Sequence, residues 1–416
     1  MSGVETKRFD YPLPENFADF DPNDFKEKCC DWLANEAGNR RVAISASGGV
    51  DSTAATFLLK ESLGPEMVYP FFLEDGARRI IRGRHEHQIA REMFSEFSGM
   101  HVIFAQDRFM PKMEGVSDGE AKRKIFINEY REISNAYLKS LDDIGLGDVL
   151  IADGTIRPDI VETEGNVKSQ HNVGWSYSHG KLEPLASLYK PHVRQVAIAL
   201  GLSPDFSHRI PCPGPAQWLR TTGAPNQEKM ELAQVCTEYV EEAIEEWCLR
   251  NWGGRYRYNE ETGVREPFQY FAVVLDPGMK ENAEMNMATG QICYVMDSRT
   301  THMPEGGKRP DKPLYAPVVW VAGRAKDFDD MLKPGRILWD EFKMPRAVHS
   351  IDTIPEDEKG YPVCIRAVMS TDVKECQPMG IDLDYLHFMA KGLRARGAGR
   401  VGYDASFKPP ATVEFE

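Results

Sequence analysis

The chain of 416 residues is long enough for two or three packed domains, and its composition, 42% hydrophobic and 27% charged residues, excludes a largely disordered protein. The net charge of −14 disfavours nucleic acid as a partner, because nucleic-acid binding needs a broad basic surface. The sequence has no apolar run of membrane-spanning length, and its eight cysteines follow no disulfide or metal-ligand spacing, so we expect a cytoplasmic protein without a membrane partner.

The first half of the chain alternates segments of helical and strand character. After an amphipathic segment over about 23–37, an apolar strand that begins near Arg41 enters the turn Ser47-Gly48-Gly49, which opens a helix near Asp51. Further strands are expected over 67–73, 101–105 and 149–152, with helices up to Phe97 and over about 120–140. This alternation predicts an α/β fold in which a parallel sheet has helices on both faces.

The proline-rich run over 210–215 ends this alternation and predicts a boundary between a first domain, 1–215, and a second domain, 216–416. The second domain is expected to be a smaller α+β unit. Its predicted elements are a helix over 227–250, strands over 268–275, 318–321 and 363–368, a helix over 383–396 and a terminal strand over 411–415. The segment 276–360 is rich in Gly, Pro, Lys and Asp, and we interpret it as an insertion that decorates this domain.

The turn after the first apolar strand has the chemistry of a phosphate-binding loop. Two adjacent glycines allow backbone N–H groups to converge on an anion, and the N-terminus of the following helix adds unpaired donors. Ser47, Ser52 and Thr53 offer hydroxyl groups, and Asp51 offers a carboxylate for a divalent metal that bridges phosphate oxygens. The loop lacks the lysine of the G-x-x-x-x-G-K-[ST] pattern, so the expected ligand is a pyrophosphate group held in another way. An ordinary strand-turn-helix corner is the alternative.

The sequence Ser47-Gly48-Gly49-Val50-Asp51-Ser52 resembles the Ser-Gly-Gly-x-Asp-Ser signature of the N-type ATP pyrophosphatases, and the chain as a whole is similar to the synthetase part of GMP synthetase. The segments that carry this likeness are Phe72–Arg79, Glu120–Ile125, Gly154–Glu162, Lys168-Ser169-Gln170-His171-Asn172-Val173-Gly174, Glu183–Leu185 and Lys408-Pro409-Pro410-Ala411-Thr412-Val413-Glu414-Phe415-Glu416.

The resemblance implies an ATP-dependent ligase that requires Mg²⁺. A carbonyl oxygen of a purine nucleotide monophosphate would attack the α-phosphorus of ATP, and ammonia would then displace AMP, with xanthylate as the default substrate. The resemblance also implies a homodimer formed through the C-terminal domain.

The same resemblance assigns roles to individual residues. ATP is expected to contact Ser45, Ser47, Gly48, Gly49, Val50, Asp51, Ser52, Thr53, Phe72, Gly76, Gly154 and Thr155, with Asp51 as the metal ligand. The expected catalytic residues are Asp51, Lys122, Lys124, Lys168 and His171. The nucleotide substrate is expected to contact Arg79, Arg157, Asp159, Glu162, Asn172, Gly214, Lys408, Thr412, Val413 and Glu414.

Several of these residues have a plainer alternative. Lys122 and Lys124 would stabilise charge around phosphorus if their helix forms a lid over the site, but they could equally lie on a solvated helix face. Asp159 follows a proline and could cap a turn, and His171 could be a structural histidine.

The sequence departs from the family in two ways that leave the nucleophile open. It has no glutamine amidotransferase motif, so ammonia would come from solution or from a separate glutaminase subunit. It also carries Cys212 where the family has phenylalanine, so a second hypothesis is an enzyme that inserts sulfur into a purine nucleotide or related metabolite through a cysteine persulfide. A buried, inert cysteine is the commoner case. A third hypothesis is a nucleotide sensor without catalysis.

Overall fold

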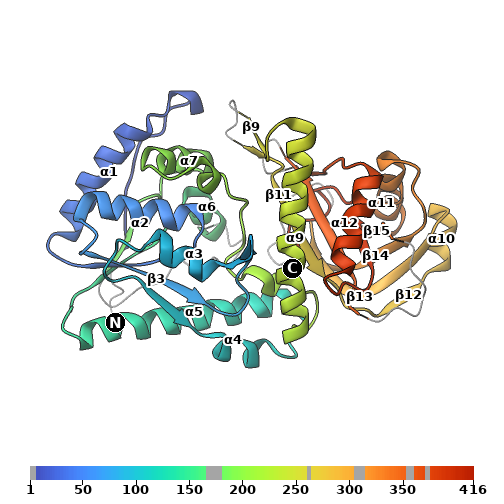
Figure 1. Cartoon of the computed structure of the whole chain (residues 1–416), viewed down its shortest axis with the longest axis horizontal. Coiled ribbons are helices and arrows are strands. Elements are labelled where there is room, and N and C mark those ends of the chain that lie inside the picture. The colour runs from blue at the N-terminus through green and yellow to red at the C-terminus, as the bar shows by residue number, and fades with distance from the viewer. Residues whose placement is uncertain (1–5, 165–179, 260–263, 304–313, 353–359, 371–374) are drawn as a thin grey trace.

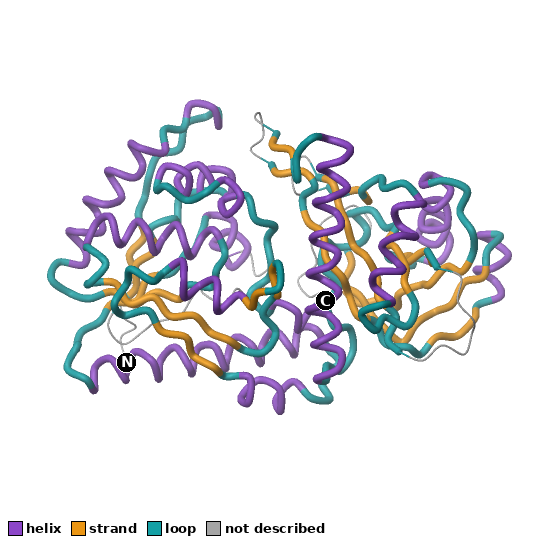
Figure 2. Tube along the Cα trace, viewed as in Figure 1, coloured by secondary structure: helices purple, strands orange, loops and turns teal. Residues whose placement is uncertain are grey.

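The computed structural model describes residues 6–164, 180–259, 264–303, 314–352, 360–370 and 375–416. Within these residues the first half of the chain builds a six-stranded sheet and the second half builds an eight-stranded sheet (Figure 1). Helices flank both sheets (Figure 2). In the described part of the chain, we find no helix that is both long enough and apolar enough to cross a membrane.

All strands of the first sheet run parallel, in the order β1-β8-β7-β2-β3-β6. Their bounds are β1 (Thr6–Arg8), β2 (Val42–Ser45), β3 (Val68–Glu74), β6 (His101–Phe104), β7 (Leu150–Ala152) and β8 (Lys181–Glu183). Strand β2 has β3 on one side and the later strand β7 on the other, so the chain reverses its direction of winding at β2. In such sheets ligands bind beyond the carboxyl ends of the strands at this position.

Helices cover both faces of the first sheet because its strands are apolar on both sides. Helices α1 (Pro22–Ala37), α2 (Val50–Leu63) and α7 (Lys190–Ala199) pack together over one face, and α5 (Gly119–Asp143) covers the other (Figure 1). Ile44 and Phe72 belong to the first of these cores, and Ala43 and Phe71 to the second. The other elements of this half are α3 (Glu86–Met93), α4 (Gln106–Met113), α6 (Arg157–Glu164), α8 (Pro204–Ser207) and the hairpin of β4 (Ile80–Ile81) and β5 (Arg84–His85).

The second sheet is mixed, in the order β11-β16-β18-β15-β14-β13-β12, with parallel pairing of β16 with β18 and of β14 with β15. Its strands are β11 (Gln269–Val274), β12 (Met279–Glu281), β13 (Ile292–His302), β14 (Leu314–Ala322), β15 (Ala347–Ser350), β16 (Val363–Met369) and β18 (Val401–Asp404), with β17 (Gln377–Pro378) beside β16. The other elements are α9 (Gln227–Trp252), α10 (Ala283–Thr289), α11 (Phe328–Phe342), α12 (Leu383–Arg394), β9 (Arg257–Tyr258) and β10 (Arg265–Glu266).

Alternation along β11 separates the two faces of this sheet. Tyr270 and Ala272 pack into the core that α9 and α12 share, whereas Phe271 and Val273 lie in the core that contains Phe415 from the end of the chain. Successive side chains of a strand point to opposite faces of the sheet. One face of this sheet therefore packs against the helices, and the other packs against the C-terminal tail.

The structure confirms the expected parallel α/β sheet followed by a domain of mixed structure. It differs in two respects. Segment 276–360 contributes β12 to β15, which form half of the second sheet, so it is not a decoration; its status as an insertion relative to the family stays a prediction. The tail 411–415 is docked, but it forms no strand: it joins the sheet through an isolated bridge between Ala411 and His302 and a hydrogen bond from Thr301 N to Phe415 O, 2.7 Å. The boundary at 215 stays a prediction.

Candidate active site between the two sheets

The glycine turn lies at the carboxyl end of β2, where the winding direction changes. Gly48 has a φ of +76°, which disfavours every residue with a side chain, and Gly49 is the N-cap residue of α2. The hydroxyl oxygens of Ser47 and Ser52 lie 3.0 Å apart across the turn. The N–H groups of the first turn of α2 therefore lie beside a compact loop, and this arrangement suits an anion.

Two further residues of the expected ATP site lie against this loop. A Cβ atom on Gly154, which follows β7, would lie 2.7 Å from Ser52 N, so only glycine allows this approach of backbone to backbone. Phe72 is fully buried, and its ring lies 3.8 Å from the place where a side chain on Gly48 would begin. Loop, strand end and aromatic ring are thus brought together as the resemblance implies.

Within the part of the chain that the structure describes, the carboxylate of Asp51 is paired on one oxygen only. Its Oδ2 accepts from Lys190 Nζ at 2.6 Å, while its buried Oδ1 has no hydrogen-bond partner among the described residues. An unpaired carboxylate oxygen beside a phosphate loop fits Mg²⁺, which prefers oxygen ligands. The described residues form no cluster of three or more His, Cys, Asp or Glu side chains for a metal, so Mg²⁺ would take its other ligands from phosphates and water.

A series of polar contacts leads from the loop to the second domain. It runs through the carbonyl of Gly48 and the side chains of Arg209, Glu86, Arg79 and Glu241, and we call it the Glu86 chain. Arg209 Nη1 donates to Gly48 O (2.7 Å), and its Nη2 donates to Glu86 Oε1 (3.1 Å). Arg79 Nη2 donates to the same oxygen (2.9 Å), and its Nη1 donates to Glu241 Oε1 on α9 (3.3 Å). Burial would raise the pKa of Glu86, but the neighbouring arginines outweigh it and lower the pKa below its usual value, so the carboxylate stays charged.

The docked tail brings a second set of polar residues to the same interface. Glu414 Oε1 accepts from Arg220 Nη2 (3.0 Å) and from Gln269 Nε2 (2.8 Å). Arg220 is 1% exposed, and its Nη1 has no hydrogen-bond partner among the described residues. A buried guanidinium nitrogen without a partner is costly, and a bound anion or carbonyl group would satisfy it.

Lys122 does not lie on a solvated lid. It is fully buried, donates to Thr221 O at 2.7 Å, and forms an ion pair with Glu416, whose other carboxylate oxygen accepts from Gly223 N at 3.1 Å. Burial lowers the pKa of Lys122 and raises the pKa of Glu416 to about 7. The solvated helix face does not fit this position, because the residue is buried and joins α5 to the chain end. Its catalytic role stays a prediction.

The remaining predicted residues differ in exposure and in their contacts. Lys124 and Arg157 are exposed, and Asp159 accepts from Ile156 N (3.1 Å), which is the capping contact named as its alternative. Thr155 is buried, and its hydroxyl donates to Glu183 (3.0 Å). Lys168, His171 and Asn172 lie outside the described residues, as does the side chain of Glu162.

Five other predicted residues have contacts within the protein: Ser45 bonds to Tyr130, the carbonyl of Gly214 accepts from Arg78, the hydroxyl of Thr412 lies 2.8 Å from that of Thr301, Val413 packs beside Phe415, and the backbone of Lys408 pairs with Cys376. Thr53 is buried, and its hydroxyl has no hydrogen-bond partner among the described residues, while Gly76 has a φ of +86°.

Cys212 is partly buried beside the Glu86 chain. Burial raises the pKa of its thiol, while Arg220 and Arg79 act in the opposite direction without restoring it. A thiol with a raised pKa is a poor nucleophile, so the site gives the sulfur-transfer hypothesis no chemical support.

Sequence reasoning missed Arg209, Arg220, Gln269 and Glu86. No motif links them, because most of their partners lie far away in the chain; Glu86 is the exception, since Arg79 is seven residues away. A further local signal is that Arg209 directly precedes the proline-rich run.

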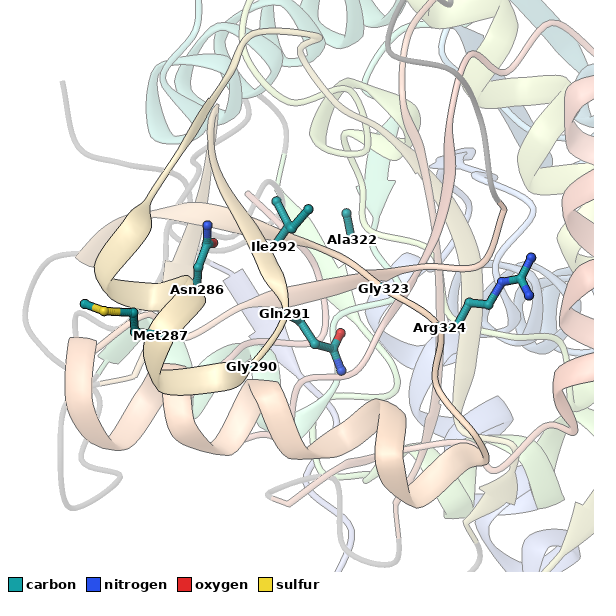
Figure 3. A pocket seen from close by; sticks show the side chains of 8 residues that line it. All are labelled: Asn286, Met287, Gly290, Gln291, Ile292, Ala322, Gly323 and Arg324. Carbon is teal, nitrogen blue, oxygen red and sulfur yellow. The ribbon is translucent and has the colours of Figure 1, made fainter.

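A separate surface pocket lies near the edge of the second sheet, between the end of α10 and the end of β14 (Figure 3). It is lined by Asn286, Met287, Gly290, Gln291, Ile292, Ala322, Gly323 and Arg324, none of which is a predicted site residue.

Comparisons with known proteins assign the family. No family model matches the chain. A protein of Halorubrum lacusprofundi that is named as a subunit of glutamine-hydrolyzing GMP synthase is 37% identical over 389 residues, covering 91% of this chain and 94% of that protein. The protein of the same name from Sulfurisphaera tokodaii is 29% identical over 409 residues, covering 95% of this chain and all of that protein.

Solved structures with a similar arrangement include an NMN synthetase from Francisella tularensis (TM-score 0.37, 19% identity, 48% of this chain and 79% of that chain) and an NH3-dependent NAD synthetase from Campylobacter jejuni (TM-score 0.35, 18% identity, 45% and 77%). At these scores the two structures add nothing to the assignment, which depends on the sequence relatives. The chain belongs to this family of GMP synthase subunits, which are ATP-dependent carbon–nitrogen ligases.

Proposed function

We propose that this protein converts xanthylate, ATP and ammonia to GMP, AMP and pyrophosphate. The observation that carries the proposal is the glycine turn at the carboxyl end of β2, with the unpaired Oδ1 of Asp51 beside it, in a chain of this family. ATP would lie with its pyrophosphate in the turn between Ser47 and Ser52 and with its adenosine towards Phe72 and Gly154.

The reaction would proceed in two displacements. The base carbonyl oxygen attacks the α-phosphorus, the bond from that phosphorus to the bridging oxygen breaks, and pyrophosphate leaves with the electron pair. Ammonia then attacks the adenylated carbon and loses a proton, and AMP leaves. Asp51 would hold Mg²⁺, which when bound neutralises charge on the phosphates.

The nucleotide monophosphate would lie at the domain interface, among Arg79, Arg220, Gln269 and Glu414. The unpaired Nη1 of Arg220 supports this position, because it is a buried donor next to the carboxylate of Glu414. Lys408 and Thr412 of the tail have donors suited to a phosphate. We further propose that ammonia is supplied by a separate glutaminase subunit, as the name of the relatives suggests, and that the C-terminal domain forms a homodimer.

The direct test incubates the purified protein with ATP, Mg²⁺, xanthylate and ammonium chloride. We expect AMP and pyrophosphate in equal amounts, both dependent on xanthylate. Asp51→Asn should abolish the reaction, whereas Glu61→Gln, a change to an exposed residue of the same helix, should leave it unchanged. Release of ADP in place of AMP would refute the proposal, and binding of ATP without any pyrophosphate release would favour a sensor.

A further inference from the structure

Glu86 lies between the ATP loop and the proposed nucleotide site, and it serves two arginines with one oxygen. Its Oε1 accepts from Arg79 Nη2 at 2.9 Å and from Arg209 Nη2 at 3.1 Å. Its Oε2 accepts from the main-chain N–H of Arg79 at 3.2 Å. Glu86 is 6% exposed and Arg79 is 4% exposed, so water cannot easily replace either contact. The two guanidinium groups therefore share one buried acceptor.

Each arginine reaches a different site. Arg209 bonds to the carbonyl oxygen of Gly48, within the turn that would hold pyrophosphate. Arg79 extends to Glu241 on α9, in the domain that carries the tail residues of the nucleotide site. Arg79 has a second carboxylate partner in Glu241, whereas Arg209 shares Glu86 with Arg79, so an anion in the turn would offer Arg209 a charge partner that it does not share.

Binding of pyrophosphate in the turn would draw Arg209 towards the new anion and away from the shared oxygen. Arg79 already donates to the same oxygen from Nε (3.2 Å) and Nη2 (2.9 Å), and the loss of the competing donor would strengthen these two contacts and fix the orientation of Arg79. A guanidinium that is already oriented loses less entropy when a nucleotide binds. The sign of the effect is therefore positive: ATP should tighten nucleotide binding.

We propose that Glu86 is a positioning residue that couples the ATP loop to the nucleotide site, so that each ligand raises the affinity for the other. This inference rests on the proposed function, since it takes Arg79 as part of the nucleotide site. Coupling between two binding sites is reciprocal, so it can be measured from either ligand.

The test measures the dissociation constant of xanthylate by calorimetry, with and without a saturating ATP analogue that carries a methylene group between the α- and β-phosphorus. In the wild-type protein we expect the analogue to tighten xanthylate binding at least about fivefold. The ratio of the dissociation constant without the analogue to that with it measures the coupling. In Glu86→Gln, which keeps the size of the side chain but loses its charge, this ratio should fall to within about twofold of one.

The matched control is Glu238→Gln. Glu238 accepts from Gly83 N at 2.5 Å, so it also joins the β4–β5 hairpin to α9, but it lies outside the Glu86 chain. This variant should keep the wild-type ratio. A merely structural role for Glu86 would weaken both affinities and leave their ratio unchanged. Arg209→Lys tests the same coupling from the other end, should Glu86→Gln not fold, and we expect the same ratio near one.

Three outcomes are decisive. A wild-type ratio in Glu86→Gln, or in Arg209→Lys if only that variant folds, would overturn the inference. Binding of both ligands to the wild-type protein without coupling would overturn it as well, while leaving the proposed function intact. Failure of the wild-type protein to bind xanthylate at all would refute the proposed function, and the inference with it.

Discussion

The buried pair of Lys122 and Glu416 offers a quantitative test of how the chain end is anchored. Lys122 is fully buried and Glu416 is 2% exposed, so removing one charge leaves the other without a partner in a place with little water. Breaking such a pair from one side costs about 3–5 kcal/mol. We therefore expect Lys122→Met and Glu416→Gln each to lower the free energy of unfolding by that amount.

The double variant should be more stable than either single variant. It buries no unpaired charge, and a glutamine at position 416 can still accept from Gly223 N through its amide oxygen. Replacing both partners of a buried ion pair is often nearly neutral, so we expect the double variant to recover at least about half of the loss. Lys122→Met also leaves Thr221 O without its donor, which limits the recovery.

The assay is thermal unfolding followed by circular dichroism at a fixed pH of about 8, where the wild-type carboxylate is charged. For a domain of about 200 residues, 1 kcal/mol shifts the melting temperature by roughly 2–4 °C, so each single variant should melt roughly 6–20 °C lower than the wild type. Costs below about 1 kcal/mol, or losses that simply add in the double variant, would refute the anchor. If Lys122 instead contacts a reacting phosphate, the double variant would recover stability without recovering turnover.

Three further predictions concern other parts of the molecule. Gly154→Ala places a methyl group 2.7 Å from Ser52 N and should displace the start of α2, so calorimetry should show ATP affinity reduced at least about tenfold with the melting temperature little changed; unaltered affinity would contradict the close packing. Cys212→Ser should keep turnover within about twofold of the wild type, because burial raises the pKa of this thiol and so disfavours the nucleophilic thiolate; a complete loss would support the persulfide hypothesis. Burial raises the pKa of Asp352 from 3.8 to about 6 against the pull of Val401 N and Arg394, so the folded state holds this proton to a higher pH than the unfolded state, and stability should fall by about 2 kcal/mol as the pH rises from about 4 to about 6. Chemical denaturation of Asp352→Asn over this range should lack that decline, and an equal decline in both proteins would assign it to other groups.

The parts of this structure that could be predicted from sequence are those that depend on neighbours in the chain. The turn from Ser47 to Asp51 is a local arrangement of small residues between an apolar strand and a helix, and it lies where expected. The parallel sheet follows from buried strands that alternate with helices. The alternating apolar residues of the tail over 411–415 predict a strand, but its order comes from tertiary contacts: Arg346 donates to the carbonyl oxygens of Thr412 (2.8 Å) and Glu414 (3.1 Å).

Pairings between distant residues could not be predicted in this way. Arg220 and Glu414 are 194 positions apart, and Lys122 and Glu416 are 294 positions apart, so no local pattern indicates that they meet. For Lys122 a signal did exist: it lies four and seven residues before Phe126 and Glu129, on the buried side of α5. A basic residue on the buried stripe of a helix indicates a fixed partner. The interpretation of this helix as a lid did not take that signal into account.

The interface between the two domains combines an apolar cluster with buried pairs of opposite charge. Arg79, Arg209, Arg220 and Lys122 are all buried or nearly so, and each one has a carboxylate partner. Replacing such pairs by apolar residues often increases stability, so stability alone does not explain why they are there. Their use becomes clear if anions bind at this interface: the carboxylates keep the arginines charged and ordered while the site is empty, and the donor that is left over, Nη1 of Arg220, is then ready for a ligand. The same pairing would couple the ATP loop to the nucleotide site. If Arg209 turns to a phosphate, it must release the carboxylate of Glu86, which Arg79 also uses.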